Sequence, residues 1–523
     1  MSLAAAQAAL ARRDFAAARE AAEAVLSERP SDPAANQILG IVALELGDVE
    51  LAKQHLRRAD AAAPGQPHIL NALGVAARRS GETAEARRFF TRAGERGLID
   101  GWRNLGNLES IAGDARASMR AYEKALRLKP DDAASHAGLA QALELLHDLA
   151  GARMHAETAL NSDPSNENAA LALAQVAVRE KQYAEGEALA DRVVKRGVSK
   201  TNQALAWGVI GDARDKSGDS AGAFAAFTAS NRILLAMNEK HLRDSHLPYH
   251  PDGVERMTAF VRAQDFSGWR AAENARDEAP VFLVGFPRSG TTLLEQVLSA
   301  HSQLVCIEER EHLARSAQEA AADPEKLAAL SAAGIEGIRA EYWRRVRAEA
   351  NVGKRGVVDK LPLNIVFLPL IRRVFPDAKV LLALRDPRDV VLSCYQQRFG
   401  MNAAMVQFLE LQAAAAYYDK VMTLGLLCRE KLGLALHEVR YENVVADLEG
   451  VAREVTSFLG LDYEPSMLAF REAALQRAIN TPSARQVVEP IYARSVARWK
   501  RYETQLAPVL PLLDAWAKRL GYE

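Results

Sequence analysis

The chain has 523 residues, more than one ordinary hydrophobic core accommodates, so two or three domains are expected. Its hydrophobic share of 49% and charged share of 25% are those of a folded globular protein. A net charge of −1 excludes the strongly basic character of nucleic-acid-binding proteins, so any anion-binding site must be local.

The N-terminal segment, residues 1–13, is rich in alanine but lacks the apolar region of a signal peptide. No stretch approaches the roughly 20 apolar residues that span a bilayer. Cys306, Cys394 and Cys428 are too few and too scattered for a disulfide framework or a zinc site. We therefore expect a soluble, cytoplasmic protein with neither a membrane span nor a nucleic-acid partner.

A dipeptide of Leu or Ile followed by Gly or Ala recurs through the N-terminal half at steps of 34, 32, 34, 34 and 37 residues. The copies are Leu39-Gly40, Leu73-Gly74, Leu105-Gly106, Leu139-Ala140, Leu173-Ala174 and Ile210-Gly211. Turn signals such as Gly47-Asp48 keep the same phase. This period is typical of a helix–turn–helix repeat, and the segment is identified as a tetratricopeptide-repeat array. The predicted domains are the array over residues 1–231, a connector over 232–279 and a second domain over 280–523.

The function of the array stays open at this point. Each unit buries its apolar face only against its neighbours, so the recurring small and aromatic residues are packing residues. The array resembles others that offer a groove to a peptide or protein. A plain scaffold or dimerisation surface is an equal alternative.

The second domain opens with a predicted strand, loop and helix. The apolar run at residues 281–284 is followed by Gly-Phe-Pro-Arg-Ser-Gly-Thr-Thr at residues 285–292, and helical periodicity begins at Thr291. This arrangement aims backbone N–H groups and a helix dipole at an anion, although a simple Gly/Pro turn is the alternative. In the nucleotide-binding loop G-x-x-x-x-G-K-[ST], a Lys stands where this chain has Thr291. Its loss argues against a nucleoside triphosphatase and favours a donor with one 5′-phosphate and a sulfate, with Arg288 supplying positive charge.

The run from Phe286 to Leu294 resembles the 5′-phosphosulfate loop of sulfotransferases. The resemblance is greatest to the tyrosylprotein branch and to the bacterial proteins that join tetratricopeptide repeats to a sulfotransferase domain. It implies 3′-phosphoadenosine 5′-phosphosulfate (PAPS) as the donor. The donor would be held by loop residues Arg288, Ser289, Gly290, Thr291 and Thr292.

A donor with a 3′-phosphate needs a second anion site. Residues 379–384 form another apolar run, followed by Arg385-Asp386-Pro387-Arg388, where Asp386 and Pro387 predict a helix start. The segment resembles the family's 3′-phosphate motif, which assigns Arg385 and Ser393 to that phosphate. Arg388 is predicted to be a solvated or salt-bridged helix residue instead.

Transfer to a hydroxyl also needs a base, because a phenol has a pKa of about 10 and an aliphatic alcohol a far higher one. Glu309 aligns with the catalytic Glu of the tyrosylprotein C-G-E-E segment, which the resemblance makes the base. The alternatives are that Glu308 and Glu309 are ordinary exposed carboxylates, or that His312 is the base.

Two further residues follow from the same resemblance. Lys360 corresponds to the family's Lys in N-K-x-P, which contacts the bridging and sulfate oxygens, and a surface lysine capping a turn is the alternative. Tyr441 corresponds to a Tyr near the donor, with core packing as the alternative.

Glu489 departs from the pattern, because it stands where the family has a donor-holding Lys. Arg494, Arg498 or Lys500 are candidates to replace that charge.

Together these observations predict an α-helical tetratricopeptide-repeat solenoid followed by an α/β phosphate-loop domain with a mainly parallel sheet. Strands are expected near residues 281, 304, 357, 380 and 434. The expected activity is metal-free transfer of a sulfuryl group from PAPS to a hydroxyl, with Glu309, Lys360 and Arg288 as catalytic residues. The acceptor class is unknown, and a peptide or protein held by the array is one possibility. A nucleotide kinase or other phosphate-loop enzyme, and a repeat-based adaptor with an inactive domain, are the alternatives.

Overall fold

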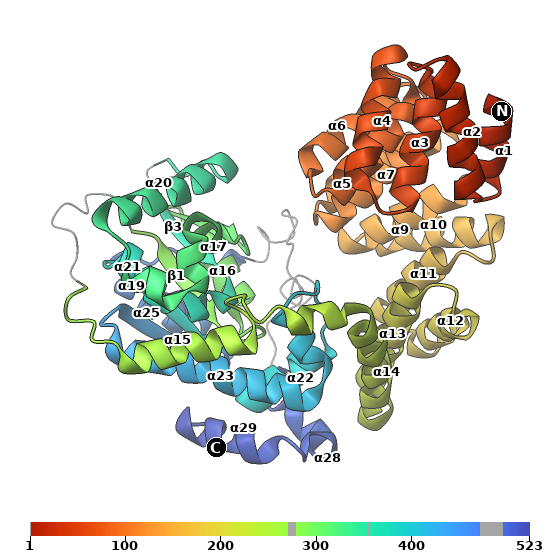
Figure 1. The fold of residues 1–523 in the computed structure, drawn as a ribbon. Helices are drawn as coiled ribbons and strands as arrows, with labels where there is room; N and C mark the ends of the chain where they lie inside the picture. The colour runs from red at the N-terminus through yellow and green to blue at the C-terminus, as the bar shows by residue number, and fades with distance from the viewer. Residues whose placement is uncertain (1, 270–278, 354, 471–494, 523) are drawn as a thin grey trace. The chain divides into compact units, whose positions relative to one another are not determined.

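The computed structural model describes residues 2–269, 279–353, 355–470 and 495–522 (Figure 1). The chain forms two compact units, Met1–Val193 and Val194–Glu523.

The first unit consists of helices that pack in consecutive pairs, as predicted for tetratricopeptide repeats. The helices are α1 (Leu3–Ala11), α2 (Phe15–Glu28), α3 (Pro33–Glu45), α4 (Val49–Ala62), α5 (Pro67–Arg79), α6 (Thr83–Glu95), α7 (Ile99–Ile111), α8 (Ala115–Leu128), α9 (Ala133–Leu145), α10 (Leu149–Ser162), α11 (Glu167–Arg179) and α12 (Tyr183–Arg196).

The repeated motif residues explain both the turns and the close packing of these pairs. Gly47 adopts a left-handed conformation (φ +86°), and Asp48 then caps α4 by accepting a hydrogen bond from Leu51 N–H. A Cβ at Gly74 would lie 2.5 Å from the ring of Phe90, so this glycine lets α5 and α6 approach each other. The interpretation of the dipeptides as packing residues is confirmed.

The second unit begins with one more helical pair, α13 (Lys200–Ser217) and α14 (Ser220–Asn238). Between this pair and the sheet lie a short 3-10 helix, η1 (Glu239–Arg243), and α15 (Pro251–Ala263). Buried residues of α15, including Val254, Met257 and Val261, belong to the core of the second unit. The segment expected to be a connector therefore contains a helix that packs into this core.

The five predicted strands form one sheet in the order β2-β3-β1-β4-β5, and every pairing is parallel. The strands are β1 (Val281–Gly285), β2 (Leu304–Glu308), β3 (Gly356–Lys360), β4 (Lys379–Leu384) and β5 (Ala435–Arg440). The α/β fold with a parallel sheet is thus confirmed. Since all strands run the same way, their carboxyl ends meet at one edge.

Residues along the central strands alternate between two apolar layers. Phe282 and Val284 pack into one core and Leu283 into the other, and β4 alternates in the same way. The sheet therefore lies between two layers of helices (Figure 1). The remaining elements are α16 (Thr291–Ser299), α17 (His312–Ala317), α18 (Glu319–Ala322), α19 (Pro324–Ala328), α20 (Ala332–Glu349), η2 (Pro362–Phe367), α21 (Leu368–Val374), α22 (Pro387–Gln396), η3 (Met405–Leu409), α23 (Leu411–Lys431), α24 (Tyr441–Ala446), α25 (Leu448–Leu459), η4 (Pro465–Ala469), η6 (Arg498–Tyr502), α28 (Glu503–Leu506) and α29 (Leu510–Arg519).

Candidate active site

The predicted loop joins the end of β1 to the start of α16. Gly285 is required by close packing, because a Cβ there would lie 2.5 Å from the carbonyl oxygen of Ala383 on β4. Arg288 and Gly290 both have positive φ, +70° and +92°, which turns the loop toward the helix. No described side chain caps α16, so its first N–H groups are not satisfied by a capping residue. Such an N-terminus favours an anion.

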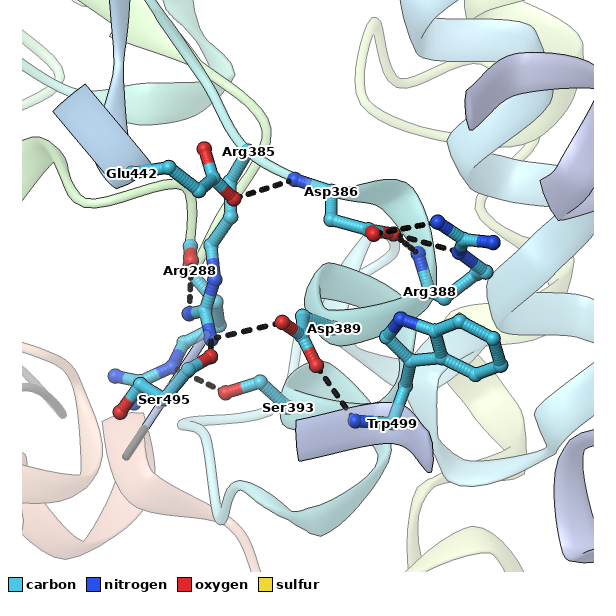
Figure 2. Close-up of polar contacts among 9 residues, drawn as sticks. All are labelled: Arg288, Arg385, Asp386, Arg388, Asp389, Ser393, Glu442, Ser495 and Trp499. Atoms are coloured by element: carbon cyan, nitrogen blue, oxygen red, sulfur yellow. Dashed lines mark hydrogen bonds and ion pairs between the residues drawn. The ribbon is translucent and has the colours of Figure 1, made fainter. Parts of the chain in front are cut away.

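Arg385 follows β4 and lies beside this loop (Figure 2). Its Nη1 donates to the carbonyl oxygen of Arg288 at 3.0 Å, and its Nη2 donates to that of Ser495. The guanidinium carbon lies 4.6 Å from the ring centroid of Tyr441. The Nε of Arg385 is buried and has no hydrogen-bond partner among the described residues, which leaves a donor for a ligand.

Arg288 connects the loop to the second predicted anion motif. Its Nε donates to Ser393 Oγ on α22 at 3.0 Å, and its side chain is 9% exposed. Burial lowers the pKa of Arg288 to about 10, and the like charges of Arg385 and Arg498 act in the same direction. The structure therefore brings Arg288, Arg385 and Ser393, from distant motifs, into one cationic site.

Tyr441 lies at the start of α24 and packs against both parts of this site. A Cβ at Gly290 would lie 2.6 Å from its ring, and the Arg385 guanidinium carbon lies 4.6 Å from the centroid of the same ring. Tyr441 therefore lies against the loop, as expected of a residue near the donor.

Arg388 has a different environment from Arg385. Its guanidinium pairs with Asp386 at 2.7 Å and with Asp514 at 3.1 Å, and it stacks on Trp499 at 4.1 Å. Asp386 also caps α22 by accepting from the Arg388 N–H. Arg388 is thus the salt-bridged helix residue that was predicted.

Lys360 and Glu309 meet at the ends of β3 and β2. Lys360 is fully buried, and its Nζ lies 2.9 Å from Glu309 Oε1. The Glu309 N–H also donates to the Lys360 carbonyl oxygen, and Glu309 has a φ of +48°. The alternative of a surface lysine is wrong. The Glu309 side chain remains 32% exposed, so it can still be reached by a substrate.

Two more carboxylates lie near the Lys360 ammonium. Glu295 Oε2 on α16 is 3.9 Å away and Glu308 Oε1 is 4.0 Å away. Burial raises the pKa of Glu295 to about 7, against the opposing effect of Lys360. The sequence reasoning missed Glu295, whose position one helical turn after Thr291 was the available signal.

A pocket that is open to solvent unites the loop with Glu309. Its polar wall includes Arg288, Thr291, Thr292 and Glu309. The remaining lining residues are Tyr249, Pro287, Gly290, Glu311, Leu361, Pro362, Leu363, Phe399, Asn402 and Met405. Tyr249 comes from the segment predicted to be a connector, and its composition carried no signal of this role. His312, the alternative base, is not part of this described wall and lies 2.9 Å from Glu349.

The C-terminal motif of the sequence is only partly described. Residues 483–490, which include Glu489, lie outside the described residues, and so does Arg494. Arg498 is described, and its Nη2 lies 2.8 Å from Asp215 Oδ2. Of the two described candidates, Arg498 and Lys500, Arg498 is the one whose positive charge contributes to the lowered pKa of Arg288.

Within the described ranges, no group of three or more His, Cys, Asp or Glu side chains has the arrangement of a metal site. Across the same ranges, each helix is too short or too polar to cross a membrane.

Asp359, next to Lys360 on β3, gives a testable pH dependence of stability. It is fully buried, accepts a hydrogen bond from the Tyr342 hydroxyl at 2.9 Å, and burial raises its pKa to about 7. Because the native state keeps a proton that the unfolded state releases, stability contributed here is lost as pH rises from about 4 through 7. The loss is up to about 4 kcal/mol.

We expect Asp359→Asn, which stays neutral, to remove this loss. Thermal unfolding followed at a series of pH values should show a variant that gains on the parent protein as pH rises from 4 to 8. Parallel curves for the two proteins would contradict the buried, proton-binding state of Asp359.

The strand, glycine-bounded loop and uncapped helix at the carboxyl edge of a parallel sheet define a phosphate-loop α/β domain. Residues 280–465 match the model of the sulfotransferase family, and residues 3–67 and 104–169 match that of the tetratricopeptide repeat. The chain thus carries tetratricopeptide repeats followed by a domain of the sulfotransferase family, as the sequence motifs predicted.

Individual relatives are similar at low identity. An uncharacterized protein of Aquifex aeolicus (strain VF5) is 30% identical over 253 residues, which are 46% of this chain and 33% of that protein. Protein-tyrosine sulfotransferase A of Caenorhabditis elegans is 25% identical over 54% of this chain and 73% of its own length. Nodulation protein NoeE of Sinorhizobium fredii is 26% identical over 48% of this chain and 68% of its own length. The chain therefore spans a third of the Aquifex protein.

Proposed function

We propose that the C-terminal domain moves a sulfuryl group from PAPS to an acceptor hydroxyl and releases adenosine 3′,5′-bisphosphate. The observation that carries this proposal is the hydrogen bond from Arg288 Nε to Ser393 Oγ, 3.0 Å long. It makes the phosphate loop and the Arg385 motif two walls of one site. A donor with anionic groups at both its 5′ and 3′ positions fits such a site better than ATP, whose phosphates are all on the 5′ side.

The donor-binding roles follow from the two walls. The Ser289 hydroxyl and the N–H groups of Gly290, Thr291 and Thr292 would hold the 5′-phosphate at the α16 N-terminus. Arg385, with its buried Nε available, and Ser393 would hold the 3′-phosphate. Tyr441 would pack against the nucleotide between these groups.

The transfer roles belong to the groups that line or border the pocket. When bound, the donor supplies an activated sulfuryl group. Glu309 would accept the proton of the acceptor hydroxyl, and Lys360 and Arg288 would stabilise negative charge on the transferring oxygens. The 2.9 Å contact of Lys360 with Glu309 holds base and cation side by side. Catalysis would rest on position and charge, without a metal ion.

The proposed acceptor is a hydroxyl group of a peptide or protein that the repeat array captures. The names of several relatives describe protein-tyrosine sulfotransferases, which supports this class of acceptor.

All three cysteines lie in the described residues and form no disulfide with one another. Free cysteines are usual in reducing compartments, and the proposed location of the protein is the cytoplasm.

Binding and transfer are tested separately. Calorimetric titration should show that adenosine 3′,5′-bisphosphate binds and ATP does not; the reverse result would favour a kinase. Incubation with sulfur-labelled PAPS and a fractionated lysate should then label an acceptor. Nucleotide binding without any labelling of acceptor would favour the adaptor with an inactive domain.

A further inference from the structure

The last helical pair of the repeat array, α13 and α14, lies in the same compact unit as the sulfotransferase domain. Thr228 on α14 makes a 2.7 Å hydrogen bond with the hydroxyl of Tyr395, and Asn231 Nδ2 donates to the Tyr395 carbonyl oxygen at 2.9 Å. Tyr395 belongs to α22, the helix that carries Ser393. The pair is therefore attached to a helix of the proposed donor site.

A second attachment converges on one residue of α13, Asp215. Its Oδ2 accepts from Arg498 Nη2 at 2.8 Å, and its Oδ1 accepts from the Tyr502 hydroxyl at 2.6 Å. Its backbone carbonyl oxygen accepts from Arg501 Nη2 at 2.8 Å. Asp215 thus binds three residues of η6 at once.

The segment that contains η6 also contacts the arginine site. The Trp499 N–H donates to Asp389 Oδ1 at 2.7 Å, and the Ser495 carbonyl oxygen accepts from Arg385 (Figure 2). Although burial acts to lower the pKa of Arg498, Asp215 raises it above its ordinary value. Arg498 in turn contributes to the low pKa of Arg288. A chain of contacts therefore runs from Asp215 through η6 to Arg385 and Arg288.

We propose that Asp215 is a positioning residue for donor binding, and that the last pair of the repeat array is a structural part of the 3′-phosphate site. Asp215 holds Arg498 among arginines that would otherwise repel it, and it holds Trp499 against Asp389. This inference rests on the proposed function, since it concerns the same donor. It makes the array more than an acceptor-binding module, because its final helices shape the site of the nucleotide.

The direction in which nucleotide affinity changes when Asp215 is removed distinguishes a positioning role from a purely electrostatic one. Removing a negative charge near an anion site strengthens anion binding if charge alone matters. If Asp215 positions η6, Asp215→Ala weakens binding of adenosine 3′,5′-bisphosphate instead. We expect a loss of roughly 10- to 100-fold, with a much smaller loss for adenosine 5′-phosphate. In the transfer assay, KM for the donor should rise more than kcat falls.

The matched control is Asp212→Ala, one helical turn earlier on α13. It removes the same charge and breaks a 2.7 Å contact with Arg398, the one ion pair of Asp212 within the described residues. It should leave both affinities near those of the parent full-length protein. Tyr502→Phe keeps the ring and every charge but removes the hydroxyl that donates a hydrogen bond to Asp215. It should weaken 3′,5′-bisphosphate binding in the same direction as Asp215→Ala, and it decides the question if Asp215→Ala fails to fold.

Unchanged or tighter 3′,5′-bisphosphate binding by folded Asp215→Ala, or an equal loss for both nucleotides, would overturn the inference. If Asp215→Ala does not fold, parent-like binding by Tyr502→Phe would overturn it. The parent protein separates the two proposals. If it binds no 3′-phosphorylated nucleotide, the proposed function itself fails. If it binds and both variants match it, only the role of Asp215 fails.

Discussion

Glu309→Gln should bind adenosine 3′,5′-bisphosphate like the parent protein but transfer sulfate at least about 100 times more slowly. Gln keeps the size and hydrogen-bonding reach of the side chain but cannot accept the proton of the acceptor hydroxyl. The Glu309 carboxylate faces the pocket and is partly exposed, so an acceptor can reach it. Single-turnover transfer from labelled PAPS measures the chemical step, and calorimetry measures binding.

A matched control comes from the same pocket wall. Glu311→Gln changes the charge of the pocket by the same amount, and no proton transfer is assigned to Glu311. It should retain most of the transfer rate. Near-normal turnover by Glu309→Gln would move the base elsewhere, with His312 the next residue to replace.

Arg385→Ala should lower the affinity for adenosine 3′,5′-bisphosphate by roughly 10- to 100-fold, because charge-assisted hydrogen bonds to a phosphate are lost. The affinity for adenosine 5′-phosphate should change far less, since the loop N–H groups that would hold the 5′-phosphate are retained. Titration of both nucleotides into both proteins measures the ratio. An equal loss for the two ligands would contradict the 3′-phosphate assignment.

Arg388→Ala provides the contrast within the same motif. Its guanidinium is already paired with Asp386 and Asp514, so its removal leaves Asp386 at the start of α22 and Asp514 on α29 without this ion-pair partner. We expect a lower thermal midpoint and no preferential loss of the 3′-phosphorylated ligand. A selective loss by this variant would instead place Arg388 in contact with the donor.

Much of the fold could be predicted because its signals are local in the chain. The dipeptide period predicted the helical pairs, since a small residue opposite Phe90 or Tyr122 is a requirement of packing one helix on the next. Short apolar runs predicted all five strands, and Gly285 to Thr292 predicted the loop and helix start. The candidate residues Arg288, Arg385, Ser393, Glu309 and Lys360 came from motifs, and their roles remain predictions.

The segment between the array and the sheet shows a limit of prediction from local sequence patterns. Residues 241–253 contain turn signals and histidines, which predict a connector and nothing more. Their place in the second unit depends on α15 packing into a distant core, which brings Tyr249 to the pocket wall. No periodicity within a segment encodes the surface against which it will pack.

Local sequence signals were thus enough to predict the repeat array, the five strands, the phosphate loop and the charged residues that follow several strands. The strand order became known only from the tertiary structure. In that order β2 lies beside β3 with Glu308 opposite Lys360, and this register places Glu309 next to the buried ammonium of Lys360. The tertiary structure also decided that Arg288 meets Ser393 and that Asp215 meets η6. The physical reason is that local patterns specify backbone conformation, whereas these contacts join segments about 50 to 290 residues apart and exist only once the sheet and its helices have packed.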